Sequence, residues 1–99
     1  MYMVKQESII EFEWDKGNID KNYEKHGITP NQAEEAFLDE RLKVKKDFKH
    51  SQKEERQIAL GKNLTKNILF IVFTRRKNKI RIISARMANI KEKRNYEKT

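Results

Sequence analysis

Short apolar stretches alternate with charged segments along the whole chain, and the spacing of the apolar residues predicts eight secondary-structure elements. Ile10, Phe12 and Trp14 alternate with glutamates, which is the period-two pattern of a half-buried strand. A first strand is therefore expected over residues 9–14.

Two helices are predicted to follow this strand. Asp15 stands at an N-cap position, apolar and aromatic residues follow at helical spacing, and Gly27 suits the position after a helix end, so the first helix is expected over 15–26. The second is expected over 30–39, because Thr29 and a glutamine three residues later have the pattern of a capping box, with proline at the first helical position.

The second half of the chain is predicted to form four strands and a closing helix. The stretch "ILFIVFT" is apolar on both faces, as expected of a central strand, whereas the lysines of "LKVKKDF" suit an edge strand. The strands are predicted over 42–48, 56–61, 68–74 and 79–86, with a loop over 50–55, turns over 62–67 and 76–78, and a helix over 88–98.

This order of elements predicts an α+β fold with a small antiparallel sheet. Strands joined by short turns pair antiparallel, and the two helices after the first strand are expected to cover one face of the sheet, with a further helix at the C-terminus. A chain of 99 residues suits a single domain, 1–99.

The charge is distributed unevenly along the chain. Residues 1–40 carry four basic and ten acidic side chains, whereas residues 41–99 carry nineteen basic and five acidic ones. Between Glu55 and Glu92 there are ten lysines and arginines and no acidic residue. Such an interval attracts phosphates, an acidic protein or an anionic membrane surface, and the plain alternative is a solvated, lysine-rich surface.

The sequence lacks the residues that several common kinds of catalysis require. The chain has no cysteine, its two histidines are isolated, its three glycines stand apart, and none of its serines lies in a G-x-S-x-G motif. We therefore expect neither a metal nor a cofactor. The longest apolar run, residues 68–73, is far too short to span a membrane, and a cytoplasmic protein without a membrane partner is expected.

The chemistry that the sequence still allows is phosphate chemistry that depends on cationic side chains. In RNA, a 2′-hydroxyl attacks the neighbouring phosphodiester if a protein aligns it, accepts its proton and stabilises the developing charge, and the arginine fork matches two phosphate oxygens. Glu55 is the candidate proton acceptor, and Tyr96, Lys93 or a histidine is the candidate donor. The whole candidate set comprises Glu55, Arg56, Arg75, Arg76, Arg81, Arg86, Lys93, Arg94 and Tyr96, with His26 and His50 elsewhere in the chain.

Strand alternation limits which arginines can meet. On a regular strand Arg81 and Arg86 point to opposite faces, so they reach one site only if a bulge intervenes or if Arg86 lies past the strand end.

Each candidate also has a purely structural explanation. Glu55 suits a surface ion pair with Arg56, Tyr96 suits the packing of a terminal helix, and His26 is favoured near a helix C-terminus by the dipole. The residues leave three functions open: a ribonuclease, a non-enzymatic RNA- or ribosome-binding module, and a scaffold whose basic face receives an acidic partner.

Taken together, the motifs resemble the BrnT family of type II toxins. The similarity rests on "FEWD", a following asparagine, "KHG", "A…F.D", "ER…ALG", "RIISARMA" and "KRNYE", in this order from about Phe12 to Glu97. The resemblance implies a RelE-like ribonuclease fold and metal-independent RNA cleavage that slows translation. It also implies inhibition by a BrnA-type antitoxin with a ribbon-helix-helix region, and contact with operator DNA only through that antitoxin.

The resemblance also implies roles for individual residues. Glu55 becomes the candidate base, and Arg56, Arg81 and Arg86 become candidate phosphate ligands. Which of Arg75 and Arg76 fills the family's single arginine position stays open, and the antitoxin is expected to cover the basic face with an acidic segment. His26 and Tyr96 complete the catalytic candidates, and the RNA-binding candidates are Arg75, Arg76, Lys93 and Arg94.

Overall fold

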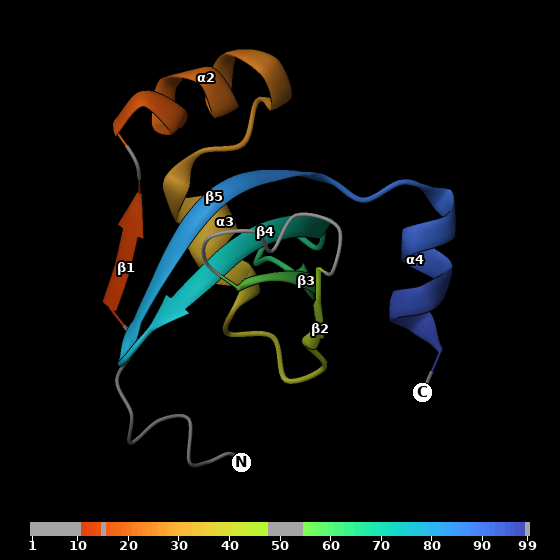
Figure 1. Cartoon of the computed structure of the whole chain (residues 1–99). Helices are drawn as coiled ribbons and strands as arrows, with labels where there is room; N and C mark the ends of the chain where they lie inside the picture. Colours follow the sequence, from red (N-terminus) through yellow and green to blue (C-terminus); the bar gives the residue numbers. More distant parts are fainter. Residues whose placement is uncertain (1–10, 15, 48–54, 99) are drawn as a thin grey trace.

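The protein is built on one five-stranded sheet with three helices, within the residues that the computed structural model describes, 11–14, 16–47 and 55–98. In Figure 1, α2 (orange) and α4 (blue) lie on well-separated sides of this sheet. The α+β class and the predicted order of elements are confirmed. The elements are β1 (Glu11–Trp14), α2 (Lys16–His26), α3 (Pro30–Ala36), β2 (Lys43–Lys46), β3 (Arg56–Lys62), β4 (Ile68–Arg76), β5 (Lys79–Met87) and α4 (Ile90–Glu97).

The strand order across the sheet is β1-β5-β4-β3-β2. The three pairs joined by short connections, β2–β3, β3–β4 and β4–β5, are antiparallel as predicted. The expectation of a purely antiparallel sheet is wrong at one edge, where β1 runs parallel to β5. No turn joins these two strands, and α2 and α3 carry the chain from β1 to β2 at the opposite edge, so no hairpin fixes the direction of β1.

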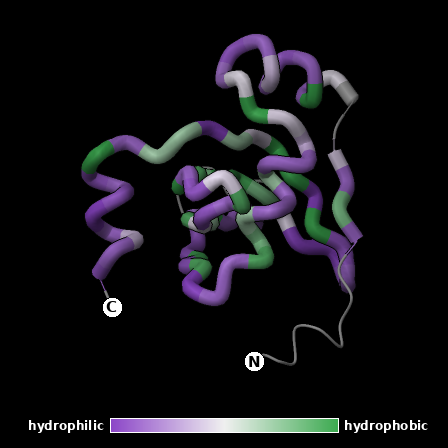
Figure 2. Tube along the Cα trace, turned by 180° about the vertical axis from the view of Figure 1, so that it is seen from behind, coloured by the Kyte–Doolittle hydropathy of each residue, from purple (hydrophilic) through white to green (hydrophobic). Residues whose placement is uncertain are grey.

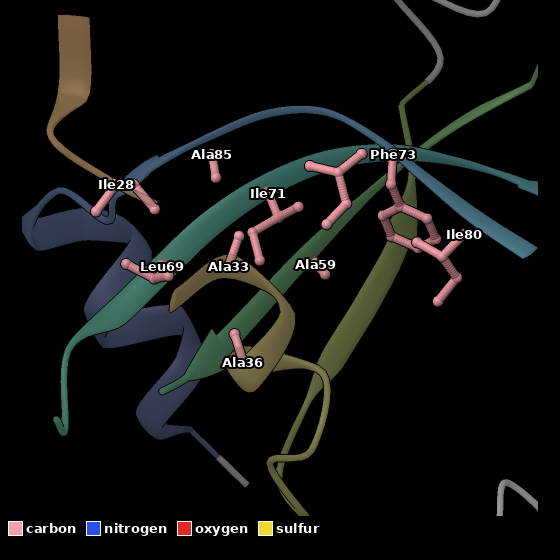
Figure 3. Close-up of a cluster of buried hydrophobic side chains, with 10 residues drawn as sticks. Ile28, Ala33, Ala36, Ala59, Leu69, Ile71, Phe73, Ile80 and Ala85 are labelled. Atoms are coloured by element: carbon pink, nitrogen blue, oxygen red, sulfur yellow. The ribbon is translucent and has the colours of Figure 1, made fainter. Parts of the chain in front are cut away.

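Each face of the sheet has its own apolar cluster. Leu69 and Ile71 of β4 lie near Ala33 of α3 in Figure 3, and Phe73 of the same cluster packs edge-on against the ring of Phe37. The alternate residues of the same strand point the other way, because successive strand side chains leave opposite faces. On that second face, Leu60, Ile68 and the partly buried Phe70 pack with Ala88 and Tyr96, which brings α4 onto the sheet.

Local sequence signals fix where the helices begin and end. The capping box of α3 is confirmed, with Thr29 as N-cap, and Gly27 takes the left-handed conformation expected after a helix end, with φ +70°. The helix α3 ends at Ala36, three residues earlier than predicted. A second capping box, formed by Asn89 and Glu92, starts α4, and the sequence interpretation had not identified it.

Some expectations lie outside the described residues. These are the N-cap role of Asp15, the start of the first strand at 9–10, the end of the 42–48 strand at Phe48, and most of the 50–55 loop, including His50.

Figure 2 shows α4 as hydrophilic along most of its length, so few of its residues hold it on the sheet. Within the described part of the chain, none of the helices is long and apolar enough to span a membrane.

We predict that Gly61→Ala destabilises the fold. A Cβ at this position would lie 2.5 Å from the carbonyl oxygen of Ala36 and 2.8 Å from Cδ1 of Leu42, so α3 would have to move away from β3. We expect the free energy of unfolding, measured by denaturant titration, to fall by about 1–3 kcal/mol. Lys66→Gly is the control: Lys66 has a φ of 68°, which glycine adopts without strain, so its stability should be unchanged or slightly raised. Wild-type stability in Gly61→Ala would contradict this close packing.

Candidate functional site

A β-bulge in β5 brings Arg81 and Arg86 to the same face of the sheet. Val72 of β4 pairs with Ser84, but the next residue, Phe73, pairs with Ile82, which leaves Ile83 as an extra residue in β5. An extra residue reverses the alternation of side chains beyond it. This is the geometry that the sequence required for the two arginines to meet.

The face that carries α4, which we call the α4 face, also holds Arg56. Directly opposite residues of antiparallel strands point to the same side, and Thr74 of β4 pairs with Arg56 of β3 on one flank and with Arg81 of β5 on the other. Phe70 of β4 pairs with Arg86 in the same way. All three arginines are half-buried. Arginine side chains commonly bury the apolar stem and keep the charged group near solvent.

The guanidinium of Arg86 is held in place by its neighbours. Its two terminal nitrogens each donate to one carboxylate oxygen of Glu92, both at 2.9 Å, and its carbon lies 4.0 Å from the ring centroid of Phe70. Burial raises the pKa of Glu92, but the hydrogen bonds from Arg86 and the backbone of Asn89, together with the charges of Arg86 and Lys45, outweigh it and lower the pKa. The forked pair ties β5 to the first turn of α4.

His26 lies near Arg86 because α2 is pinned to the strand next to the bulge. The buried Asn22 accepts a hydrogen bond from the backbone N–H of Ala85 at 2.9 Å and donates to the carbonyl of Ile28 at 3.3 Å. One helical turn later, His26 ends α2. Burial and then the positive charges of Lys25 and Arg86 lower the pKa of His26, so the imidazole is neutral at neutral pH.

Tyr96 is anchored away from solvent and has a partner. Its side chain is 2% exposed, and its hydroxyl donates to Asp39 at 2.5 Å. Burial, followed by the hydrogen bond to Asp39 and its charge, raises the pKa of Tyr96 to about 12. Burial raises the pKa of Asp39, but the hydrogen bonds from Tyr96 and from the backbone N–H groups of Arg41 and Lys62 outweigh it, and the pKa is lowered.

Of the remaining candidates, only Arg76 shares the sheet face of the three arginines on a neighbouring strand position, and the others lie elsewhere. Glu55 forms an exposed ion pair with Lys46 of the edge strand β2, at 2.6 Å. The neighbours Arg75 and Arg76 point to opposite faces because the strand alternates, and Arg76, which pairs with Lys79, is on the α4 face. Lys93 and Arg94 are exposed on α4.

The α4 face continues toward β2 as a hollow of about 430 Å³. Lys43 and Lys45 line it, and the amino group of Lys43 donates to the backbone carbonyls of Asn95 and Lys98 at the end of α4. Cations near the last carbonyls of a helix are stabilising. In the part of the chain that the structure describes, no three acidic or histidine side chains gather as a metal site would require.

Four residues that shape this face were missed from the sequence: Asn22, Asp39, Thr74 and Glu92. Glu92 had a readable signal, since an asparagine three residues before it completes a capping box. Asp39 is the aspartate of the "A…F.D" motif, but its role as the acceptor for Tyr96 depends on a contact distant in sequence. Asn22 and Thr74 also act through contacts distant in sequence.

Comparison with known proteins gives a family and a fold for this chain. The model of the family described as "Ribonuclease toxin, BrnT, of type II toxin-antitoxin system" matches residues 14–92. The chain therefore belongs to the BrnT family of ribonuclease toxins, and the resemblance seen in the sequence is confirmed.

A solved structure gives the same fold. The chain is similar to the 1.1 Å crystal structure of the ribonuclease toxin BrnT of Brucella abortus, with a TM-score of 0.63 and 24% sequence identity, over 82% of this chain and 97% of that chain. At this identity the likeness shows the fold alone. No curated protein sequence matches the chain significantly.

We predict that Tyr96→Phe lowers the free energy of unfolding by about 1–2 kcal/mol, because it removes a hydrogen bond to a charged group. Asp39 has a lowered pKa in the folded state, so its contribution to stability is present above its unfolded pKa and is lost as the pH falls through the folded pKa. Without Tyr96 that pKa moves back toward its ordinary value, and the loss of stability in acid should become smaller.

Thermal unfolding of wild type and Tyr96→Phe between neutral and acidic pH tests this. Tyr23→Phe is the matched control, because Tyr23 is 56% exposed, and it should follow the wild-type curve. If Tyr96→Phe and Tyr23→Phe lost the same free energy of unfolding relative to wild type, the bond between Tyr96 and Asp39 would not stabilise the fold.

Proposed function

We propose that the protein is a metal-independent endoribonuclease that cleaves RNA on the α4 face and so inhibits translation in the cytoplasm. The observation that carries the proposal is the convergence of Arg56, Arg81 and Arg86 on one sheet face, in a member of a ribonuclease toxin family. Rigid strands hold these residues, which favours precise positioning of a phosphate.

The arginines compensate the charge that develops during cleavage. The 2′-oxygen forms a new bond to phosphorus while the bond from phosphorus to the 5′-oxygen breaks, leaving a 2′,3′-cyclic phosphate and a 5′-hydroxyl. Arg56 and Arg81 flank one position of β4, so a phosphate between them receives hydrogen bonds from two guanidinium groups. Two guanidinium groups bound to the phosphate stabilise the pentacovalent charge, which is why we propose that no metal is needed.

Arg86 has a different part in this arrangement. Because Glu92 accepts from both of its terminal nitrogens, the net charge of the pair is small and the fork fixes the guanidinium. Its positive charge is one of the causes that lower the pKa of His26. We assign Arg86 as a phosphate ligand at the end of the site nearest His26.

We assign proton transfer to His26. Its lowered pKa keeps it neutral at neutral pH, so it can accept the proton of the 2′-hydroxyl, and solvent protonates the leaving 5′-oxygen. The ion pair of Glu55 with Lys46 supports a role at the rim of the site rather than at the reacting atoms. The buried hydroxyl of Tyr96, already bound to Asp39, supports a role in anchoring α4.

Membership of a type II toxin family implies an antitoxin partner. We propose that this partner is a BrnA-type antitoxin with a ribbon-helix-helix region, that an acidic segment of it covers the α4 face, and that operator DNA is bound only through it. The lysines of the adjacent hollow extend the positive surface that such a segment would meet.

We predict that Arg81→Ala lowers RNA cleavage at least about 100-fold, because it removes a charged donor from the transition state. The assay uses labelled RNA with EDTA present and identifies the fragment ends. Arg75→Ala is the control, since Arg75 is an exposed arginine on the opposite face, and it should cleave within about twofold of wild type. RNA binding without scission by wild type, even on translating ribosomes, would support a binding module instead.

We further predict that His26→Gln slows cleavage more than Glu55→Gln. Because the pKa of His26 is lowered, wild-type activity should hold at neutral pH and fall as the pH drops below the ordinary histidine range, where the imidazole becomes protonated. The acidic fall in activity should disappear in His26→Gln and persist in Glu55→Gln. The reverse pattern would move the base to Glu55.

A further inference from the structure

A buried hydroxyl without a partner lies between two of the arginines. Thr74 is 2% exposed, and its Oγ1 atom has no hydrogen-bond partner. In the core of a folded protein such a group costs stability, and buried polar atoms are almost always bonded. Valine has nearly the same shape and favours strands equally, so the fold itself gives no reason for threonine here.

The position of Thr74 supplies a reason. It is the central residue of a row across the sheet in which Arg56 of β3 and Arg81 of β5 are its direct partners. Directly opposite residues have Cβ atoms about 5 Å apart, so the hydroxyl lies between the bases of the two arginine side chains. It is also the nearest polar side chain that the middle strand offers to a group held between them.

We propose that Thr74 is a substrate-binding residue whose hydroxyl donates a hydrogen bond to a non-bridging oxygen of the RNA phosphate held by Arg56 and Arg81. The proposal rests on the ribonuclease function proposed above and adds a neutral donor at the floor of the same site. Since both arginines are half-buried with long flexible stems, they rearrange around the phosphate and let one oxygen reach the hydroxyl. The contact satisfies the hydroxyl only when substrate is bound.

This assignment predicts opposite effects on stability and on function. Thr74→Val removes an unsatisfied hydroxyl, so its melting temperature should equal or exceed that of wild type. The same change should weaken binding of a 2′-O-methyl RNA, which has no free 2′-hydroxyl and is not cleaved by this route, by about tenfold, and should lower kcat/KM on RNA to a similar extent. Thr74→Ser keeps the donor and should restore both binding and cleavage to near wild type.

The experiment measures the melting temperature, 2′-O-methyl RNA affinity and RNA cleavage for wild type, Thr74→Val and Thr74→Ser. Unchanged affinity in Thr74→Val would overturn the proposal, and so would a lower melting temperature, which would show that the hydroxyl supports the fold. Because the analogue is not cleaved, the affinity comparison decides the role of Thr74 even if wild type proves inactive on RNA. Inactivity would count against the proposed function alone, whereas failure of wild type to bind the analogue would overturn both.

Discussion

The β-bulge at Ile83 is the constraint on which the rest of the α4 face depends. Without the extra residue, the strand would send Arg81 and Arg86 to opposite sides, and one of them would enter the core that α3 covers. The same irregularity is stabilised from outside the sheet, since Asn22 takes the N–H of Ala85 just beyond it. The bulge therefore sets the face on which the arginines lie, and α2, bonded just beyond the bulge, places His26 where it senses the charge of Arg86.

A second set of contacts holds α4 on this face. The helix is mostly polar, and three contacts hold it. Tyr96 of α4 bonds to Asp39, and Glu92 of α4 forms the forked pair with Arg86 of β5. Lys43 of β2 donates to the carbonyl of Asn95 at the end of the helix. Glu92 serves two of these purposes, because it completes the capping box of α4 and binds Arg86. The position of the helix and the orientation of an arginine are thereby coupled, so any partner that shifts α4 also changes the charge presented by the α4 face.

Local patterns were sufficient to predict the elements and the fold class. Alternation in "EFEW", the capping box at Thr29 and the apolar run of β4 each depend on neighbours in sequence. The parallel pairing of β1 was missed because it depends on where two helices carry the chain, not on the strand itself. For the site, the alternation of strand side chains showed that Arg81 and Arg86 share a face only if a bulge lies between them. The bulge itself is seen only in the pairing of β4 with β5. The sequence does not indicate what Thr74 and Asn22 do, because their roles come from strands and helices far along the chain.

The central claim is that RNA binds on the α4 face and not on the face covered by α3. The most direct measurement is an NMR titration that follows the arginine side-chain Nε–Hε signals while a 2′-O-methyl RNA is added. The signals of Arg56 and Arg81 should shift together, with a single affinity that weakens as salt rises, while the signal of Arg75 should stay in place. Shifts of Arg75 equal to those of Arg56 and Arg81, or changes confined to α2 and α3, would contradict this claim.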